Sequence, residues 1–401
     1  MGFKIDQTRE FKLLSLKELE KIKTEFVRQS NQATKEKMES LAWYDSLIAP
    51  WEEGLETQKP VVVIDLGGSY LRTGVMIWTG KKFKWLKPIK KEKAVNEHLN
   101  PLGFINWLAK KTIPLIKESQ AKRVGFIFSY PHQPQRFGPH VTGVVTQLTK
   151  ALIIPGIKGV DIGKLYLKNL KQRQVYLKRL VILNDTVALA LSEPGVIAGV
   201  VIGTGVNICS QHPKLKNLRN LESGSFDGIR QTAMSACVDL LEHQGAYLME
   251  KQSSGRYQFR NWAYASLLTG MRVEIGREIM RQGRKIESLI VTEAYKGKFD
   301  YLKSLKLTQA EKKRLQQMAK IVLDNSAMMS GAAVAGVVKL NEKKLKGRLV
   351  RLAVTGGVIL NDEEYLNNFR KTIEKLTKKK VEIIQVKDPI KGAAVAALKE
   401  D

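Results

Sequence analysis

The sequence predicts an α/β protein with two related lobes that face a common cleft. Three short apolar runs each end in a glycine turn, at residues 61–69, 199–205 and 352–357. Strand-like runs alternate along the chain with stretches of helical periodicity, which is the pattern of α/β folds. A chain of 401 residues with 43% hydrophobic content is long enough for two domains with sizeable cores.

The first 55 or so residues are predicted to be helical, because apolar residues recur there at helical spacing among charges. Residues 61–64 then form an apolar run, and a second extended segment follows at 70–78. Together they predict a β-hairpin closed by a glycine turn. Further strands are predicted at 123–130, 179–183, 199–202, 206–210, 352–354 and 381–386, and helices at 104–117, 187–191, 232–249, 310–340 and 391–398.

The chain is strongly basic, with 67 Lys and Arg against 39 Asp and Glu, a net charge of +28. The basic residues cluster at 81–93, 164–179 and 371–380. Such an excess attracts polyanions, and phosphorylated small molecules are another option. No helix-turn-helix, zinc or RNA-binding signature accompanies the charge. We therefore expect a solvated cationic surface, weak salt-sensitive adhesion to nucleic acid, and no specific nucleic-acid partner.

Cysteine and histidine usage argues against disulfides and structural zinc. Cys209 and Cys237 lie in no CxxC pair, and the five histidines stand at no metal-ligand spacing. No export signal is visible at the start of the sequence. The apolar stretches at 196–209 and 327–340 are interrupted by Gly, Asn or Lys and are too short to span a bilayer. We expect a cytoplasmic protein without a membrane partner.

Glycine turns after strands are candidate phosphate sites. Residues 65–69 place an aspartate and two glycines at a strand end, where successive N–H groups can bind an anion, although a plain hairpin is the alternative. Arg72 adds a cation or is a surface residue. The turns 203–205 and 355–357 each offer backbone amides and a hydroxyl, which suit the phosphates and ribose of a nucleotide.

Asp185 is the candidate general base. It follows the strand 179–183 and precedes a helix, so its carboxylate is either a helix N-cap or a proton acceptor at the carboxyl end of a strand, where α/β sheets place their ligands.

In these motifs the chain resembles the hexokinases, ATP-dependent sugar kinases of the actin-like ATPase superfamily. Seven motifs keep the family order over most of the chain, from about residue 60 to 398. The first phosphate motif has Ser69 where Thr is usual. The matching segments are 65–72 (first phosphate motif), 126–131 and 148–150 (sugar-binding segments), 181–187 (catalytic aspartate), 202–207 (second phosphate motif), 220–226 and 249–257 (sugar-contacting Glu segments), and, more loosely, 355–357 and 391–394 (adenosine side).

The resemblance implies a two-lobed actin-like ATPase (ribonuclease H-like) fold around a central cleft. The small domain would span 60–185, with a C-terminal helix at about 388–401 returning to it. The large domain would comprise 1–59 and 186–387.

The resemblance also implies the chemistry: transfer of the γ-phosphoryl group of MgATP to the 6-hydroxyl of a hexose, as in the first step of glycolysis. Glucose is the leading substrate, with mannose and fructose as others. Asp185 would accept the hydroxyl proton, Lys150 would stabilise charge on the transferred group, and Asp65 would hold Mg²⁺ through water, with no direct protein ligand to the metal. The implied hexose-binding residues are Ser129, Thr149, Lys150, Asn184, Asp185, Asn207, Glu222 and Glu250, and the implied ATP-binding residues are Asp65, Gly67, Gly68, Ser69, Arg72, Gly203, Thr204, Gly205, Thr355, Gly356 and Gly357.

Departures from the family pattern concern the sugar pocket. Ser223 replaces an aromatic residue, Tyr130 replaces Phe, and residues 151–158 lack the usual Gly-Phe. Three alternatives stay open: a catalytically silent hexose-binding sensor on the same fold, the bacterial repressor/kinase sugar kinases, whose Cys-rich zinc motif is absent here, and a nucleic-acid-binding protein. The preferred hexose and the oligomeric state are also open.

Overall fold

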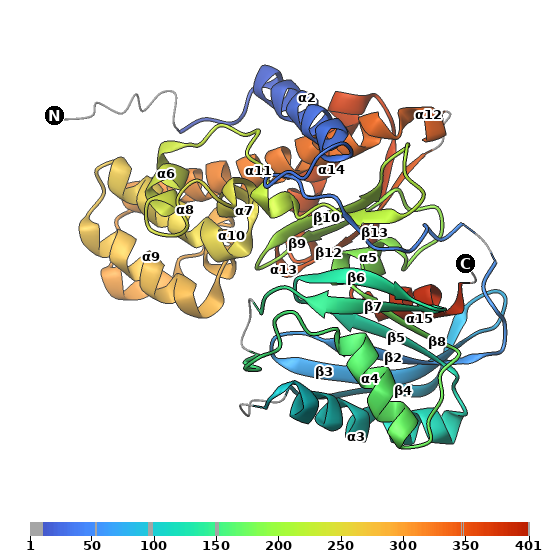
Figure 1. The fold of residues 1–401 in the computed structure, drawn as a ribbon. Helices are drawn as coiled ribbons and strands as arrows, with labels where there is room; N and C mark the ends of the chain where they lie inside the picture. The colour runs from blue at the N-terminus through green and yellow to red at the C-terminus, as the bar shows by residue number, and fades with distance from the viewer. Residues whose placement is uncertain are drawn as a thin grey trace. The chain divides into compact units, whose positions relative to one another are not determined.

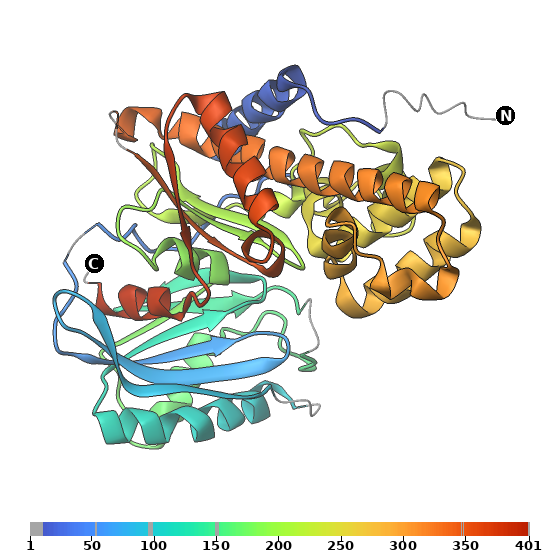
Figure 2. The same cartoon turned by 180° about the vertical axis from the view of Figure 1, so that it is seen from behind.

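Two β-sheets and their flanking helices make up the protein (Figures 1 and 2). The computed structural model describes residues 11–52, 54–94, 99–148, 152–345, 347 and 349–399. Contacts divide the chain into two compact units. Unit 1 comprises Met1–Trp43, Val200–Ile208 and Leu221–Gln385, and unit 2 comprises Tyr44–Gly199, Cys209–Asn220 and Val386–Asp401.

Unit 2 contains a seven-stranded sheet whose centre is parallel. Strands β2, β5 and β8 run parallel and in register, with Leu66 beside Phe128 and Ile127 beside Leu183. Their carboxyl ends therefore lie at one edge of the sheet. The strand order is β4 (Phe83–Lys93), β3 (Tyr70–Trp78), β2 (Pro60–Leu66), β5 (Arg123–Phe128), β8 (Arg179–Leu183), β7 (His140–Val145) and β6 (His132–Phe137).

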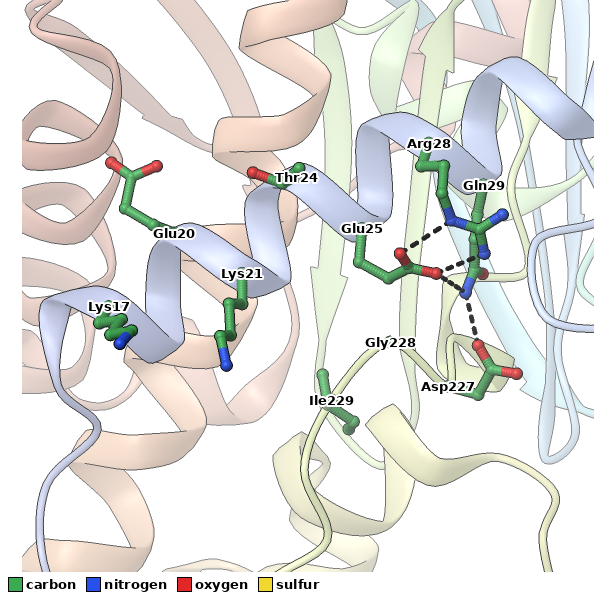
Figure 3. A pocket seen from close by; sticks show the side chains of 10 residues that line it. All are labelled: Lys17, Glu20, Lys21, Thr24, Glu25, Arg28, Gln29, Asp227, Gly228 and Ile229. Atoms are coloured by element: carbon green, nitrogen blue, oxygen red, sulfur yellow. Dashed lines mark hydrogen bonds and ion pairs between the residues drawn. The ribbon is translucent and has the colours of Figure 1, made fainter.

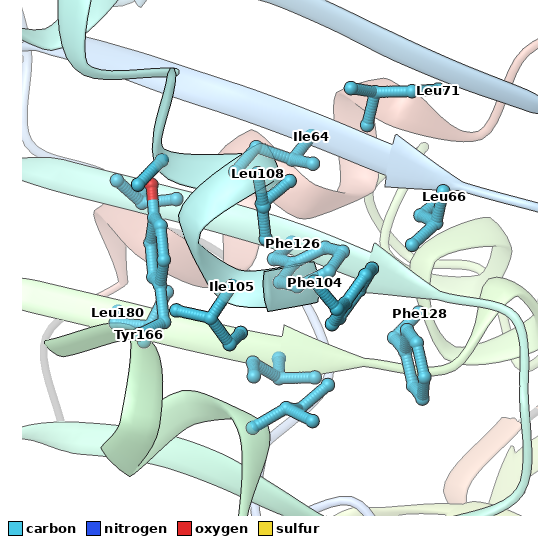
Figure 4. Packing of buried hydrophobic residues seen from close by; sticks show 14 of the residues in the cluster. Ile64, Leu66, Leu71, Phe104, Ile105, Leu108, Phe126, Phe128, Tyr166 and Leu180 are labelled. Atoms are coloured by element: carbon cyan, nitrogen blue, oxygen red, sulfur yellow. The ribbon is translucent and has the colours of Figure 1, made fainter. Parts of the chain in front are cut away.

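The central strand β2 is buried on both faces, because successive side chains point to opposite sides of a sheet. Val62 and Ile64 join one core cluster with Phe126 and Phe128 of β5, which also contains residues of α3 (Pro101–Ser119) and α4 (Ile162–Gln172) (Figure 4). Val61 and Val63 join the opposite cluster, which contains residues of α5 (Asp185–Ala190) and α15 (Ile390–Leu398). Figure 2 shows α15 lying along this sheet.

The second sheet has six strands: β12 and β13 belong to unit 1, β1 and β11 belong to unit 2, and the boundary between the units falls within β9 and β10. Its order is β1 (Tyr44–Asp45), β11 (Leu218–Asn220), β10 (Val206–Gln211), β9 (Ala198–Ile202), β12 (Val350–Thr355) and β13 (Val381–Gln385). The helices of unit 1 are α2 (Leu16–Ala33), η1 (Ser223–Ser225), α6 (Ala233–Asp239), α7 (Leu248–Ser253), α8 (Gly255–Leu268), α9 (Val273–Ile286), α10 (Leu289–Tyr295), η2 (Asp300–Leu305), α11 (Gln309–Leu340), α12 (Glu342–Leu345), α13 (Gly357–Leu360) and α14 (Glu363–Thr377).

Helix α11 is the one helix in the described part of the chain that has the length and composition to cross a membrane. The apolar stretch 327–340 lies in the second half of this 32-residue helix. In the structure, 89% of its most apolar 18-residue window is buried. Such burial is typical of the core helix of a folded domain.

The predicted hairpin at 61–78 and the predicted strands after it are confirmed. Two helix predictions are wrong. Within the described residues of 1–55, helix α2 ends at Ala33, and the segment 34–55 contains only the short strand β1. The helix predicted at 232–249 ends at Asp239, and left-handed backbone at His243, Gly245 and Tyr247 separates it from α7. The predicted domain boundaries stay a prediction.

Candidate functional site

Asp65 lies at the carboxyl end of β2 and is only 7% exposed. Arg72 donates from Nε to Asp65 Oδ2 at 2.8 Å, and from Nη1 to Asp388 Oδ2 at 3.0 Å. Burial raises the pKa of the Asp65 carboxyl, the Arg72 guanidinium opposes this shift, and the carboxylates of Asp388 and Asp185 add to it. Arg72, predicted to contact phosphate, is thus held by two carboxylates. Asp388 is a contact that the sequence analysis missed, because it lies 316 residues from Arg72.

The turn after β2 is open on one side. Gly67 donates its N–H to the Tyr70 carbonyl at 3.1 Å, which closes the hairpin between β2 and β3. A Cβ added to Gly67 would meet no atom within 4 Å. Gly68 is half-buried, and Ser69 is exposed. The turn therefore has room for a ligand beside its backbone.

Asp185 is the first residue of α5, separated from the end of β8 only by Asn184, and it is half-buried. Asn184, not Asp185, is the N-cap: its Oδ1 accepts the Thr186 N–H at 2.9 Å. The Asp185 carboxylate also accepts this N–H, at 2.8 Å. Because Asn184 occupies the cap position, the N-cap alternative does not explain an aspartate at position 185.

Three predicted residues lie at neighbouring strand ends. Ser129 follows β5 and donates its N–H to the Leu66 carbonyl of β2 at 3.2 Å. Asp65 ends β2, and Asn184 follows β8, so the parallel register places all three at one edge of the sheet. The predicted residues Thr149 and Lys150 lie outside the described residues.

Asn207, Glu222 and Glu250 are the predicted sugar contacts of unit 1. Asn207 Oδ1 accepts the N–H of Ser223, the residue after Glu222, at 3.2 Å. Glu250, on α7, accepts the Val206 N–H through Oε2 at 3.3 Å. Hydrogen bonds from backbone N–H groups to the Asn207 and Glu250 side chains therefore connect the segments that carry these three residues.

Glu222 and Glu250 occupy constrained positions. Glu222 has φ +50°, in the left-handed region that few non-glycine residues adopt. Glu250 Oε2 lies 3.0 Å from where a Cβ on Gly205 or on Gly224 would be. Both glycines thus leave space for this carboxylate, which stands at the glycine turn 203–205.

The two glycine turns of unit 1 touch each other. Gly356 has φ +115°, and a Cβ there would lie 2.3 Å from the Ile202 carbonyl oxygen, beside Gly203. Gly203 accepts the Gly255 N–H at 2.7 Å, which ties the turn to the start of α8. Thr204 Oγ1 donates to Glu287 Oε2 at 2.9 Å. No motif in the sequence marks Glu287 as part of this turn. Thr355, at the end of β12, and Gly357, which begins α13, flank Gly356.

A surface hollow of about 850 Å³ lies in unit 1 along α2, but it contains none of the predicted site residues (Figure 3). Among its lining side chains, Glu25 accepts from Arg28 and from Gln29, and Gln29 also donates to Asp227. Among the described residues, no group of three or more His, Cys, Asp or Glu side chains is arranged to hold a metal ion.

Comparison with known proteins identifies the family. Hexokinase family models match residues 4–193 and 268–399. The chain is 23% identical to the Hexokinase-like 1 protein of Arabidopsis thaliana, over 81% of this chain and 74% of that protein. It is 24% identical to Hexokinase-1 of Saccharomyces cerevisiae over 60% of this chain, a match that spans only 56% of the yeast protein's length.

Solved hexokinases share the fold. One hexokinase crystal structure superimposes with a TM-score of 0.79 at 20% identity, covering 98% of this chain and 97% of that one. The Schistosoma mansoni hexokinase complexed with glucose superimposes with a TM-score of 0.69 at 19% identity, covering 96% of each chain. The predicted two-lobed actin-like ATPase fold is confirmed. Since family models match most of its residues and hexokinase structures match its fold, the chain belongs to the hexokinase family.

Proposed function

We propose that the protein is an ATP-dependent hexokinase that transfers the γ-phosphoryl group of MgATP to the 6-hydroxyl of a hexose, with glucose as the leading substrate and mannose and fructose as others. The observation that carries the proposal is Asp185: a half-buried carboxylate at the carboxyl end of a parallel strand, next to a separate cap residue, in a chain of the hexokinase family.

Asp185 would accept the proton of the attacking hydroxyl. Asn184 Oδ1 is occupied by Thr186, so its amide nitrogen is the group that can donate to the sugar. Ser129 and Thr149 would add hydroxyl contacts. Lys150 would place a positive charge beside the phosphoryl group as negative charge develops on it.

The residues of unit 1 suit a polyol. The carboxylates of Glu222 and Glu250 can accept hydrogen bonds from sugar hydroxyls, and backbone N–H groups orient Asn207 and Glu250. A site built of such groups rejects ligands that leave them unpaired, because each polar group without a hydrogen-bond partner in a closed site makes the binding free energy less favourable.

MgATP would be bound as substrate by the glycine turns. The open side of Gly67 and the turn 203–205 would face the phosphates, although the Gly203 N–H itself donates to the Gly205 carbonyl at 2.9 Å, and Thr355, Gly356 and Gly357 would face the adenosine. Mg²⁺ neutralises phosphate charge and keeps much of its water, for which Asp65 is the proposed outer anchor. Arg72 would act by holding Asp65 in place.

The proposed activity predicts that ADP release depends on added hexose. Water competes with the sugar as nucleophile, and a kinase of this type completes its site only when the sugar is bound. ADP release should be measured with glucose, mannose, fructose and glucosamine, and without sugar. Release that is undetectable with every hexose, or equally fast without sugar, would contradict the proposal. Hexose binding in calorimetry without turnover would favour the silent sensor.

Gly67→Ala tests the phosphate turn separately from the fold. The added methyl meets no protein atom within 4 Å, so the melting temperature should stay the same or rise slightly. If the γ- and β-phosphates lie against this backbone, KM for MgATP should rise at least about tenfold, or about 1.4 kcal/mol, while the hexose affinity is unchanged. An unchanged KM for MgATP would remove this turn from the nucleotide site.

We also place the activity in the cytoplasm, at the entry of sugars into glycolysis. Cys209 and Cys237 are both free thiols, a state that a reducing compartment maintains.

A further inference from the structure

A buried ion pair lies next to the predicted sugar ligand Glu250. Lys251, the following residue on α7, has a side chain only 1% exposed, and its Nζ donates to Asp239 Oδ1 at 2.5 Å. The same ammonium donates to the His243 carbonyl at 2.8 Å. Asp239, at the end of α6, accepts the Gly245 N–H with both carboxylate oxygens, at 3.1 and 3.0 Å.

The ion pair holds an unusual loop. Residues 240–247 connect α6 to α7 (Figure 1), and three of them, His243, Gly245 and Tyr247, have φ between +46° and +78°. His243 and Tyr247 carry side chains, so their left-handed backbone is strained and persists only where surrounding contacts impose it. Lys251 and Asp239 supply such contacts, because they bind the backbone of His243 and Gly245. Tyr247 in turn precedes the first residue of α7 and accepts the Lys251 N–H at 2.9 Å.

The ionisation of Asp239 agrees with this geometry. Burial alone would raise the pKa of its carboxyl, but the Lys251 ammonium and the Gly245 N–H outweigh burial and hold the pKa below its ordinary value. The carboxylate is therefore charged, and the loop is bound by a full ion pair.

Glu250 and Lys251 are adjacent on one short helix, so the contact that orients Lys251 also orients Glu250. Glu250 Oε2 reaches the Val206 N–H at 3.3 Å and fills the space left by Gly205 and Gly224. A six-residue helix cannot hold its orientation by its own hydrogen bonds. Its position must come from tertiary contacts, and the Asp239–Lys251 pair is the buried charged contact at its centre.

We propose that Asp239 and Lys251 are positioning residues for the hexose site: their ion pair fixes α7 so that Glu250 faces the sugar, and hexose affinity depends on it. This inference rests on the proposed function. Replacing a buried ion pair by uncharged residues is often neutral for stability, so an effect on hexose affinity is the informative readout.

The main test is the double variant Asp239→Asn with Lys251→Met, which leaves no lone buried charge. The KM for glucose should rise about tenfold while kcat and the KM for MgATP change less than about threefold, since the lost contact binds substrate and transition state alike. The control is Asp324→Asn with Lys320→Met, which removes an ion pair of α11 that also has a buried carboxylate and contacts no predicted sugar ligand. It should leave the KM for glucose unchanged.

A double-mutant cycle with Glu250→Gln shows whether the pair acts through Glu250. If it does, Glu250→Gln should weaken glucose binding less in the Asp239/Lys251 variant than in the wild type. If the double variant does not fold, Asp239→Asn alone, a near-isosteric change whose amide oxygen can still accept from Lys251, should raise the KM for glucose in the same direction.

The outcomes separate the two proposals. A wild-type protein that neither binds nor phosphorylates any hexose contradicts the proposed function. A working wild type whose glucose KM is the same in the double variant as in the control, or in which Glu250→Gln has the same effect in both backgrounds, overturns the positioning role alone.

Discussion

Replacing Asp185 by Asn should lower kcat at least ~100-fold, or ~2.7 kcal/mol in the activation barrier, because a general base contributes about 10² to 10⁴ in rate. Asn is nearly isosteric and can still hydrogen-bond a sugar hydroxyl, so hexose affinity should change little. The fold should also be retained, since Asn184 is the cap of α5 and stays in place.

The measurement is kcat, hexose affinity and melting temperature on one preparation of Asp185→Asn. Asp161→Asn is the matched control, because it makes the same substitution at a true helix cap: Asp161 Oδ1 accepts the Lys164 N–H at 2.9 Å, and no predicted site residue is involved. Near-normal turnover in Asp185→Asn would remove this residue from the mechanism. A melting temperature far below that of the control would assign it a structural role.

Gly392→Ala should destabilise the protein by about 1–3 kcal/mol or more, and it should lower activity as well. A Cβ on Gly392 would lie 1.8 Å from the Ala188 carbonyl oxygen and 2.6 Å from the carbonyl carbon. Backbone atoms of α5 cannot rotate away as a flexible side chain can, so α15 and α5 must separate. Since Asp185 begins α5, this displacement reaches the proposed general base.

Thermal and denaturant unfolding of Gly392→Ala, with kcat at a temperature where the variant is folded, check this expectation. Gly103→Ala in α3 is the control, since its closest neighbour is the side-chain oxygen of Asn100 at 3.3 Å and Ala favours helix. The control should stay within about 1 kcal/mol of wild-type stability. A Gly392 variant as stable as the control would show that α15 does not approach α5 this closely.

Local patterns in the sequence determined much of the fold. An apolar run, a glycine turn and a second run predict the β2–β3 hairpin at 61–78, and strand 179–183 followed by an apolar helix predicts where Asp185 stands. Both depend on residues close together in the chain, and this proximity is what periodicity and turn composition report. The ordered motifs likewise identified the family, because the order and spacing of motifs are properties of the sequence alone.

Contacts between separate elements decided what the sequence could not. The basic run 81–93 contains the edge strand β4, since pairing with β3 outweighs its lysine content. The helix predicted at 232–249 breaks at Asp239, where the buried contact with Lys251 stabilises a left-handed loop that helical periodicity does not register.

Tertiary structure also determined which groups the charged site residues pair with. The sequence predicts Arg72 as a cation beside a phosphate turn or as a surface residue. In the structure, Asp65 and Asp388, which lies 316 residues away, both bind its guanidinium. The sequence by itself thus determined which residue types stand at the strand ends and in which order. Only the folded chain decided which charges neutralise one another, because an ion pair depends on distance in space and not on separation along the chain.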